Sequence, residues 1–130
     1  MNKDDKRRHE ILGLRFEEPQ KDKQGYDIRP IENVTLQQLQ TLKEEDFLDL
    51  EECQNDSPSV GAIIDFIEEH PNFKAHGYIV TPVRSDYRVG LEGVICSSPL
   101  TMQDIVDCTK TFRYADGLDV DEEGAWVWYD

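Results

Sequence analysis

The alternation of hydrophobic and polar residues is clearest between residues 77 and 96, where two runs favour β-strands. Residues 77–83 are rich in aromatic and β-branched side chains, and residues 87–96 alternate between apolar and polar or small side chains. The Arg-Ser-Asp sequence at 84–86 between them favours a turn. This stretch therefore predicts a β-hairpin. Gly93 predicts a bulge in the second strand, after which the side chains change faces.

Apolar residues at the three- and four-residue spacing of an amphipathic helix follow both Thr35 and Thr101. Each threonine is expected to be an N-cap, because a polar side chain three residues later completes a capping box. The helical segment after Thr35 is expected to continue, as one helix or two short ones, to near Asn55. The helix after Thr101 is expected to span about residues 102–113.

Another amphipathic helix is predicted over residues 58–69. Ser57 is its expected N-cap, and Pro58 suits the first helical position. The helix should end at or just before His70, because Pro71 disfavours helical geometry in the residue that precedes it.

The C-terminal residues predict a second hairpin, with strands at 118–121 and 125–130 and a turn at 122–124. Its last strand is apolar on both faces, with Trp126 and Trp128 on one side and Ala125, Val127 and Tyr129 on the other. Such a strand is either covered on both faces or displays aromatic side chains to a partner. The N-terminal third of the chain is a candidate for the cover.

The N-terminal region gives weaker patterns. Residues 1–10 are of mixed charge with little to bury, which predicts a flexible charged tail or an exposed helical turn. Residues 11–16 fit an edge strand or a short helix. Residues 17–25 are polar and turn-like, and residues 26–29 suit a short strand before Pro30. Residues 11–130 are expected to form a single α+β domain, with a mainly antiparallel sheet of three to five strands and helices packed on at least one face.

Composition places the chain among small globular proteins. Its 130 residues fit one domain. The three cysteines, Cys53, Cys96 and Cys108, show neither close pairing nor zinc-type spacing, so we expect reduced thiols, with Cys96 and Cys108 in the core, and a cytoplasmic location. No apolar run approaches the roughly 18 residues of a membrane span, and the N-terminus lacks a hydrophobic signal segment. No catalytic, cofactor or metal motif of useful specificity is present.

The net charge of -14 is unevenly distributed. Residues 1–30 contain eight basic and seven acidic residues, whereas residues 31–130 contain six basic and twenty-one acidic residues. Direct binding to nucleic acid is therefore disfavoured, since phosphate contacts need clustered Lys and Arg. A basic protein partner is favoured, although the same charge also serves solubility alone.

These patterns predict a non-enzymatic interaction protein of the inhibitor, immunity or nucleic-acid-mimic type, with no membrane partner; a homodimer is also compatible with the sequence. Two acidic patches, residues 44–56 and 116–130, would meet a basic surface, and tryptophans would anchor it. The expected partner-binding residues are Glu44, Glu45, Asp46, Asp49, Glu51, Glu52, Asp119, Asp121, Glu122, Glu123, Trp126 and Trp128.

Two other functions are compatible with the sequence. A small enzyme or ligand-binding domain would use a pocket near His76, Tyr78, Asp86 and Arg88. Calcium binding would use Asp119, Asp121, Glu123, Gly124 and Asp130, which match positions 1, 3, 5, 6 and 12 of a twelve-residue calcium loop. Glu at position 5, Asp at position 12 and the lack of an exiting helix make an acidic β-turn the simpler interpretation.

Overall fold

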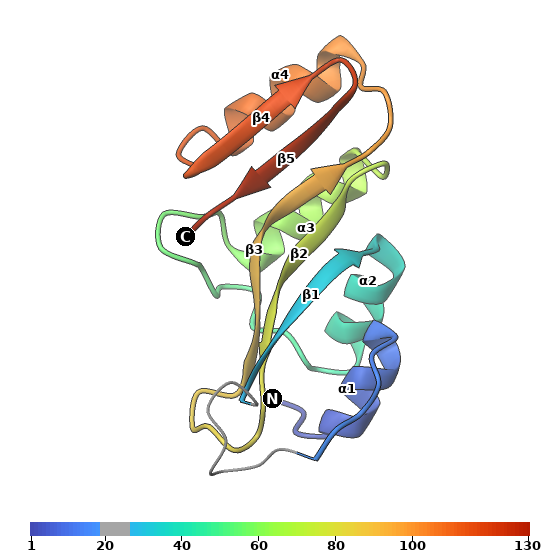
Figure 1. The fold of residues 1–130 in the computed structure, drawn as a ribbon, viewed down its shortest axis with the longest axis vertical. Helices are drawn as coiled ribbons and strands as arrows, with labels where there is room; N and C mark the ends of the chain where they lie inside the picture. Colours follow the sequence, from blue (N-terminus) through green and yellow to red (C-terminus); the bar gives the residue numbers. More distant parts are fainter. Residues whose placement is uncertain (19–26) are drawn as a thin grey trace.

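An antiparallel sheet of five strands, in the order β1-β2-β3-β5-β4, forms the frame of the molecule (Figure 1). The structure is a computed structural model that describes residues 1–18 and 27–130. The predicted α+β class and the single domain with an antiparallel sheet are confirmed. In chain order, the elements are α1 (Asp5–Leu12), β1 (Ile28–Val34), α2 (Leu36–Glu44), α3 (Val60–Glu69), β2 (Lys74–Val80), β3 (Arg88–Cys96), α4 (Met102–Thr111), β4 (Gly117–Asp121) and β5 (Gly124–Trp128).

The predicted hairpin of β2 and β3 is confirmed, and so is its bulge. His76 pairs with Gly93 but Gly77 pairs with Leu91, so Glu92 is the extra residue of β3. Beyond the bulge the alternation changes phase, and Val94 becomes fully buried on the same side as Leu91. Strand β5 pairs with β3 only from Gly93 onward. The bulge therefore marks the point where the C-terminal hairpin joins the sheet.

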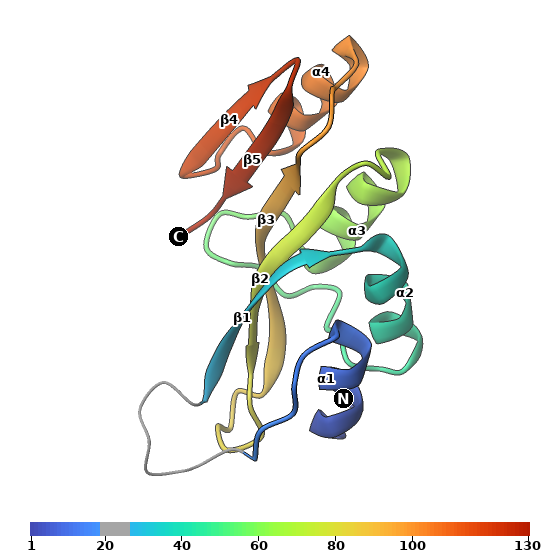
Figure 2. The ribbon, with the colours of Figure 1, turned by 45° about the vertical axis from the view of Figure 1, so that its right-hand side comes forward.

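The helices of the described residues lie on one face of the sheet (Figure 2). Helices α1, α2 and α3 lie alongside the part of the sheet formed by β1, β2 and β3. Helix α4 lies behind the β4–β5 hairpin (Figures 1 and 2). Side chains from this face and from the helices form one core. Its fully buried members include Leu39, Leu42, Phe47, Ile63, Ile67, Ile79, Val94, Phe112 and Val127.

Both predicted capping boxes are present. The Thr35 and Thr101 side chains accept hydrogen bonds from the backbone N–H of Gln38 and Asp104, whose side chains accept from the threonine N–H groups. Helix α3 instead begins two residues later than predicted, because Ser59 is the N-cap and accepts from Ala62 N. His70 ends α3 as expected.

The predicted helix up to Asn55 is wrong beyond Glu44. Asp46 takes a left-handed conformation, with φ of 63°. The backbone N–H groups of Asp46 and Phe47 donate to the carbonyls of Lys43 and Leu42, which is the Schellman pattern of a helix end. Termination at this point buries Phe47 and avoids placing like-charged carboxylates on successive turns.

The N-terminal residues contribute more to the core than the sequence indicated. Asp5 to Leu12 form α1, in which Arg8 and His9 are 0% and 1% exposed. Arg8 is buried because Asp5 and the carbonyls of Val80 and Arg88 accept its hydrogen bonds, at 2.8, 2.9 and 3.2 Å. A sequence pattern based on apolar residues overlooks such a helix.

Strand β1 continues through Pro30 instead of stopping before it. The strand lies at the edge of the sheet, where proline needs no partner for its missing N–H. The predicted strand residue Tyr26 and most of the turn-like segment 17–25 lie outside the described residues.

Cys96 and Cys108 are buried as expected, and Cys53 is exposed. Burial raises the pKa of the Cys108 thiol to about 12. None of the helices in the described part of the chain combines the length and apolar character needed to cross a bilayer.

Candidate functional site: the open face of the sheet

Strand β5 separates its side chains between two very different environments. Ala125, Val127 and Tyr129 are buried on the face that carries the helices. Trp126 and Trp128 point to the opposite face, where Trp126 is 45% exposed and Trp128 is partly buried. No helix among the described residues packs over this opposite face, which we call the open face (Figure 2). Of the two alternatives for β5, the structure therefore has the one that displays aromatic side chains.

Aromatic rings lie close against the strands of the open face. The Tyr78 ring lies over Gly90 of β3, and the Trp128 indole lies over Gly117 of β4. A Cβ atom at either glycine would collide with the ring, so these close approaches need glycine. The two rings thus occupy the space that a side chain at Gly90 or Gly117 would need.

His76, Trp126 and Trp128 form a row of neighbouring rings across β2 and β5. The His76 and Trp126 rings are nearly parallel, at 11°, with centroids 6.4 Å apart. Trp126 and Trp128 have centroids 5.8 Å apart and a tilt of 49°. His76 Nε2 donates to the Val127 carbonyl oxygen at 2.7 Å, which fixes the imidazole orientation. The row is therefore held in place by hydrogen bonding and by ring packing.

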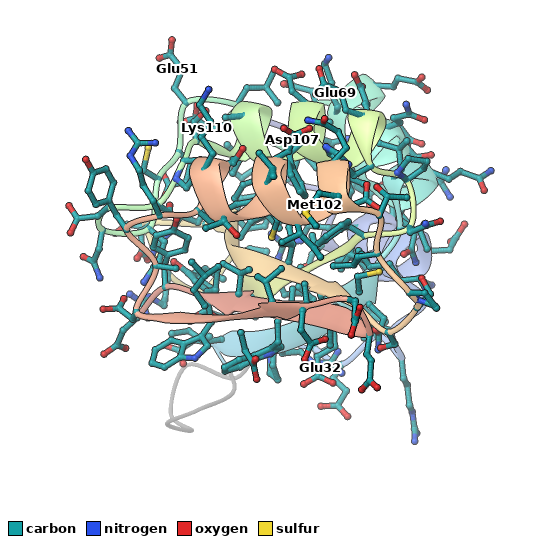
Figure 3. All side chains as sticks on the ribbon, turned by 90° about the horizontal axis from the view of Figure 1, so that it is seen from above. Glu32, Glu51, Glu69, Met102, Asp107 and Lys110 are labelled. Atoms are coloured by element: carbon teal, nitrogen blue, oxygen red, sulfur yellow. The ribbon has the colours of Figure 1, made fainter. Side chains whose placement is uncertain are left out.

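A groove of about 270 Å³ lies beside this row. Its polar and aromatic lining comes from Glu32 and Asn33 of β1, His76 of β2, Glu92 of β3 and Trp126 of β5. Figure 3 shows Glu32 on the side of the molecule opposite Glu69 and Asp107 of the helix layer. No Lys or Arg from the described residues lines the groove. Within residues 1–18 and 27–130, the acidic side chains that line it are Glu32 and Glu92.

The acidic residues of the C-terminal patch lie near the tryptophans. Asp119 pairs with Trp126 across β4 and β5, and Asp121 pairs with Gly124 at the turn. Glu122 and Glu123 form that turn and are exposed. The β4–β5 hairpin thus continues the negative charge of the open face to its upper end (Figure 1).

The first acidic patch is divided, and much of it lies elsewhere. Glu44 is the last residue of α2, and Glu45 and Asp46 follow it. This end of α2 lies near α1 and far from the β4–β5 turn (Figure 1). Arg7 donates to both oxygens of Glu45, at 2.8 and 2.7 Å. Asp46 lies 3.7 Å from the N-terminal amine. These carboxylates therefore do not join the tryptophans in one surface.

The rest of that patch belongs to the loop after α2. Asp49 is exposed and accepts from the Glu51 N–H, and Glu51 points to the helix side of the molecule (Figure 3). Glu52 lies 3.2 Å from Arg88. Farther along the loop, Asn55 Nδ2 donates to the Asp130 carbonyl oxygen. The loop therefore reaches the edge of the open face, where the carboxylate of Glu52 is already paired with Arg88.

The alternative ligand pocket is divided as well. Arg88 donates to the Tyr78 hydroxyl at 2.9 Å and to Asp86 at 2.7 Å, and Tyr78 donates to Gln54 at 2.8 Å. Hydrogen bonds from Arg84 and Arg88 lower the pKa of the Asp86 carboxyl to about 2. Arg88 thus links Tyr78 and Asp86 by hydrogen bonds, while His76 faces the separate groove.

The five residues of the calcium-loop pattern do not converge. Asp121 lies at the turn, whereas Asp130 follows the far end of β5, where its N–H donates to Asp116. Asp121 and Asp130 therefore lie at opposite ends of the extended β4–β5 hairpin.

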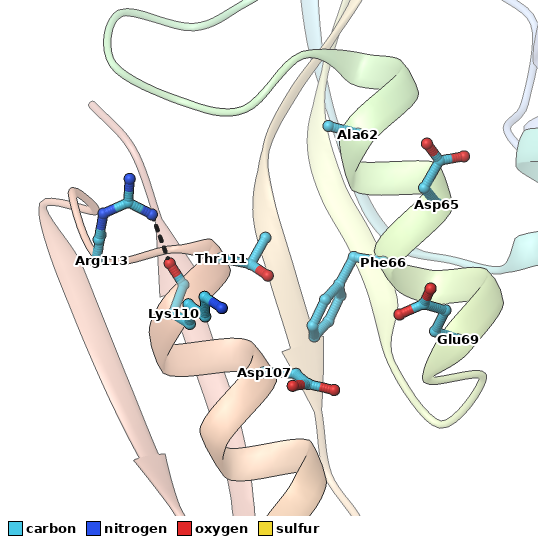
Figure 4. A pocket seen from close by; sticks show the side chains of 8 residues that line it. All are labelled: Ala62, Asp65, Phe66, Glu69, Asp107, Lys110, Thr111 and Arg113. Atoms are coloured by element: carbon cyan, nitrogen blue, oxygen red, sulfur yellow. Dashed lines mark hydrogen bonds between the residues drawn. The ribbon is translucent and has the colours of Figure 1, made fainter.

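A second polar cluster joins α3 and α4. His70 lies between two carboxylates, with Nδ1 2.6 Å from Asp104 and Nε2 3.0 Å from Asp107. Next to it lies a cleft of about 430 Å³, with Glu69 and Asp107 on opposite walls and Lys110 at its side (Figure 4). Both ring nitrogens face acceptors, so a protonated imidazole would donate to both. His70 therefore connects the end of α3 to α4 through Asp104 and Asp107.

Sequence reasoning missed Glu32 and Glu92 as members of the open face. Glu92 precedes the glycine that indicated the bulge, and the bulge directs it toward the groove. Comparisons of the chain with protein families, curated proteins and solved structures gave no match. The fold and the open face define a small α+β protein that displays aromatic rings and carboxylates on one side of its sheet.

Proposed function

We propose that the protein is a non-enzymatic interaction protein that binds a basic protein surface through the open face of its sheet. The observation that carries the proposal is the exposed Trp126 in a row of rings bordered by carboxylates. Tryptophan is enriched among the residues that dominate protein interfaces. Complementary charge accelerates association and selects the partner.

The charge of the open face favours a cationic protein over a nucleic acid. Glu32 and Glu92 line the groove, and Asp119 flanks Trp126. Phosphate groups would be repelled there, and the binding of a nucleic acid depends on clustered Lys and Arg. The proposed surface comprises the open face and the β4–β5 turn, and it leaves out Glu44, Glu45 and Asp46.

The two tryptophans of the chain are Trp126 and Trp128, so intrinsic fluorescence reports directly on the open face. A deca-arginine peptide is a suitable probe, since it contains no fluorophore. The double variant Glu32→Gln/Glu92→Gln should weaken its binding about tenfold at low salt, because two carboxylates near the rings are lost. Trp126→Thr, measured by calorimetry, should weaken it by a similar factor.

The matched control is Glu44→Gln/Glu51→Gln, which changes the net charge equally but away from the open face. It should weaken binding less than about twofold, since distant exposed charges are largely screened. Equal losses for the two double variants, together with no effect of Trp126→Thr, would show attraction by net charge alone and would overturn the proposal. Self-association that Trp126→Thr abolishes would assign the face to a second copy and would also overturn it.

A further inference from the structure

We infer that the groove beside Trp126 receives the guanidinium group of an arginine side chain, an inference that rests on the proposed function. It follows from three features of the groove: its charge, the shape of its aromatic wall and the fixed position of Glu92.

The two carboxylates of the groove are available to a ligand. Glu32 and Glu92 have no ion-pair partner among residues 1–18 and 27–130. Carboxylates elsewhere, such as Glu45 and Glu52, are already paired with arginines. A cation entering the groove would therefore meet two acceptors that make no competing ion pair within the described chain.

The aromatic wall favours a planar cation. The nearly parallel rings of His76 and Trp126 offer flat faces of similar orientation. A guanidinium group is planar and weakly hydrated, so it stacks on such faces while its edge donates to carboxylates. A lysine ammonium group is a compact point charge that retains its water more strongly. The groove should therefore distinguish arginine from lysine.

The backbone at Glu92 is held by the fold. Glu92 is the extra residue of the β3 bulge, and its carbonyl oxygen accepts from Tyr129 N–H at 2.7 Å. Burial of Tyr129 anchors this contact from the covered side. A fixed backbone reduces the ordering that binding requires.

A neighbouring hollow of about 200 Å³ limits where the cation can lie. It shares Asn33 and Ile95 with the groove, but Lys74 also lines it. The lysine would repel a guanidinium group there. Arginine is therefore expected on the Trp126 side, and the partner chain can continue over the second hollow with neutral residues.

Three blocked tripeptides test the inference: acetyl-Gly-Arg-Gly-amide and its lysine and citrulline counterparts. Binding is measured from the NMR shift of the Trp126 indole N–H during titration of the intact protein. The arginine peptide should bind about two- to fivefold more tightly than the lysine peptide, since stacking of the cation on a ring is worth about 0.5–1 kcal/mol at exposed sites. Citrulline keeps the planar shape without the charge and should give no saturable shift.

Glu92→Gln should weaken the arginine peptide about fivefold or more, whereas Glu51→Gln should leave it unchanged. Circular dichroism melting of both variants checks that the fold is retained. Equal binding of the arginine and lysine peptides, or equal effects of the two substitutions, would overturn the arginine assignment. If deca-arginine binding still depended on Trp126, the proposed function would survive that result. If it did not, both would be overturned.

Discussion

The two faces of the sheet are built from alternate residues of the same strands, yet they differ in burial and in the chemistry of their side chains. On the covered face, Ala125 and Val127 pack beneath α4 with Ile79 and Val94 in one apolar core. On the open face, aromatic rings contact the glycines of the strands, and Glu32 and Glu92 make no ion pair with any residue in the described part of the chain. We attribute stability mainly to the first face and propose recognition as the role of the second. Strand β5 also shows that a strand with apolar side chains on both faces need not be covered on both faces.

The strongest test of this division compares Phe112 with Trp126. Phe112 is 0% exposed and contacts Phe66 edge-on, with ring centroids 5.0 Å apart. Phe112→Ala should lower the free energy of unfolding by about 3–5 kcal/mol, because it leaves a cavity in the core. Trp126→Thr should cost only about 1 kcal/mol, since it removes cross-strand contacts and preserves strand propensity.

Urea unfolding followed by circular dichroism measures both losses without relying on tryptophan fluorescence. If Trp126→Thr destabilised the protein as much as Phe112→Ala, the open face would be part of the structural core, and the division between the two faces would fail.

The sequence predicted the elements that depend on local chemistry. The capping boxes at Thr35 and Thr101 and the bulge near Gly93 involve residues a few positions apart, so their patterns are visible in the chain. The sequence allowed an exposed helical turn near the N-terminus but did not predict the burial of α1, because the partners of Arg8 include carbonyls 72 and 80 positions away. A buried charge can be recognised only when the groups that satisfy it are known.

The same limit applies to the candidate site. Trp126 and Trp128 could be placed on one side of a strand from their spacing alone. Glu32 comes to the groove through the pairing of β1 with β2, and Glu92 through the bulge. Conversely, the close spacing of Glu44, Glu45 and Glu51 in sequence suggested a shared surface, which the end of α2 and the following loop divide.

The next test concerns two adjacent arginines of α1, of which Arg8 alone is buried. Arg8 is buried against Asp5, whereas Arg7 makes an exposed ion pair with Glu45. Arg8→Ala should lower the free energy of unfolding by about 3 kcal/mol, because it leaves the Asp5 carboxylate buried without its partner. Arg7→Ala should have a much smaller effect, since surface ion pairs contribute little. Chemical denaturation of both variants measures the difference. Similar losses would mean that α1 is held by its surface charges.

A smaller effect is expected at the start of α4, the helix behind the β4–β5 hairpin. The Thr101 hydroxyl accepts from Asp104 N–H at 3.1 Å. Thr101→Ala should lower the free energy of unfolding by about 1 kcal/mol, the usual value for a lost N-cap. Thr109→Ala, at an exposed position of the same helix, is the control and should have little or no destabilising effect. A loss at Thr109 equal to that at Thr101 would contradict a specific capping role.

The stability contributed by the turn between β2 and β3 should depend weakly on pH. The pKa of Asp86 is lowered to about 2 by hydrogen bonds from Arg84 and Arg88. A lowered pKa in the folded state gives stabilisation that is present above the ordinary aspartate pKa of about 3.9 and lost as the pH falls through about 2. NMR titration of the Asp86 carboxyl carbon measures this pKa directly. Arg84→Gln should raise it, and an unchanged value would show that Arg84 does not hold the carboxylate in solution.

The smallest effect concerns the electrostatic field of the open face itself. Caesium and iodide both quench indole fluorescence by contact, but their charges are opposite. Because Glu32, Glu92 and Asp119 lie around the exposed Trp126, caesium should be enriched and iodide depleted at the ring. The Glu32→Gln/Glu92→Gln variant should reduce the ratio of caesium to iodide quenching by up to about twofold, whereas Glu44→Gln/Glu51→Gln should not, because salt screens charges that lie farther away. Equal changes in both variants would mean that the field at Trp126 reflects the net charge of the whole protein. In that case the covered and open faces would still differ in packing, but the open face would have no local charge with which to select a partner.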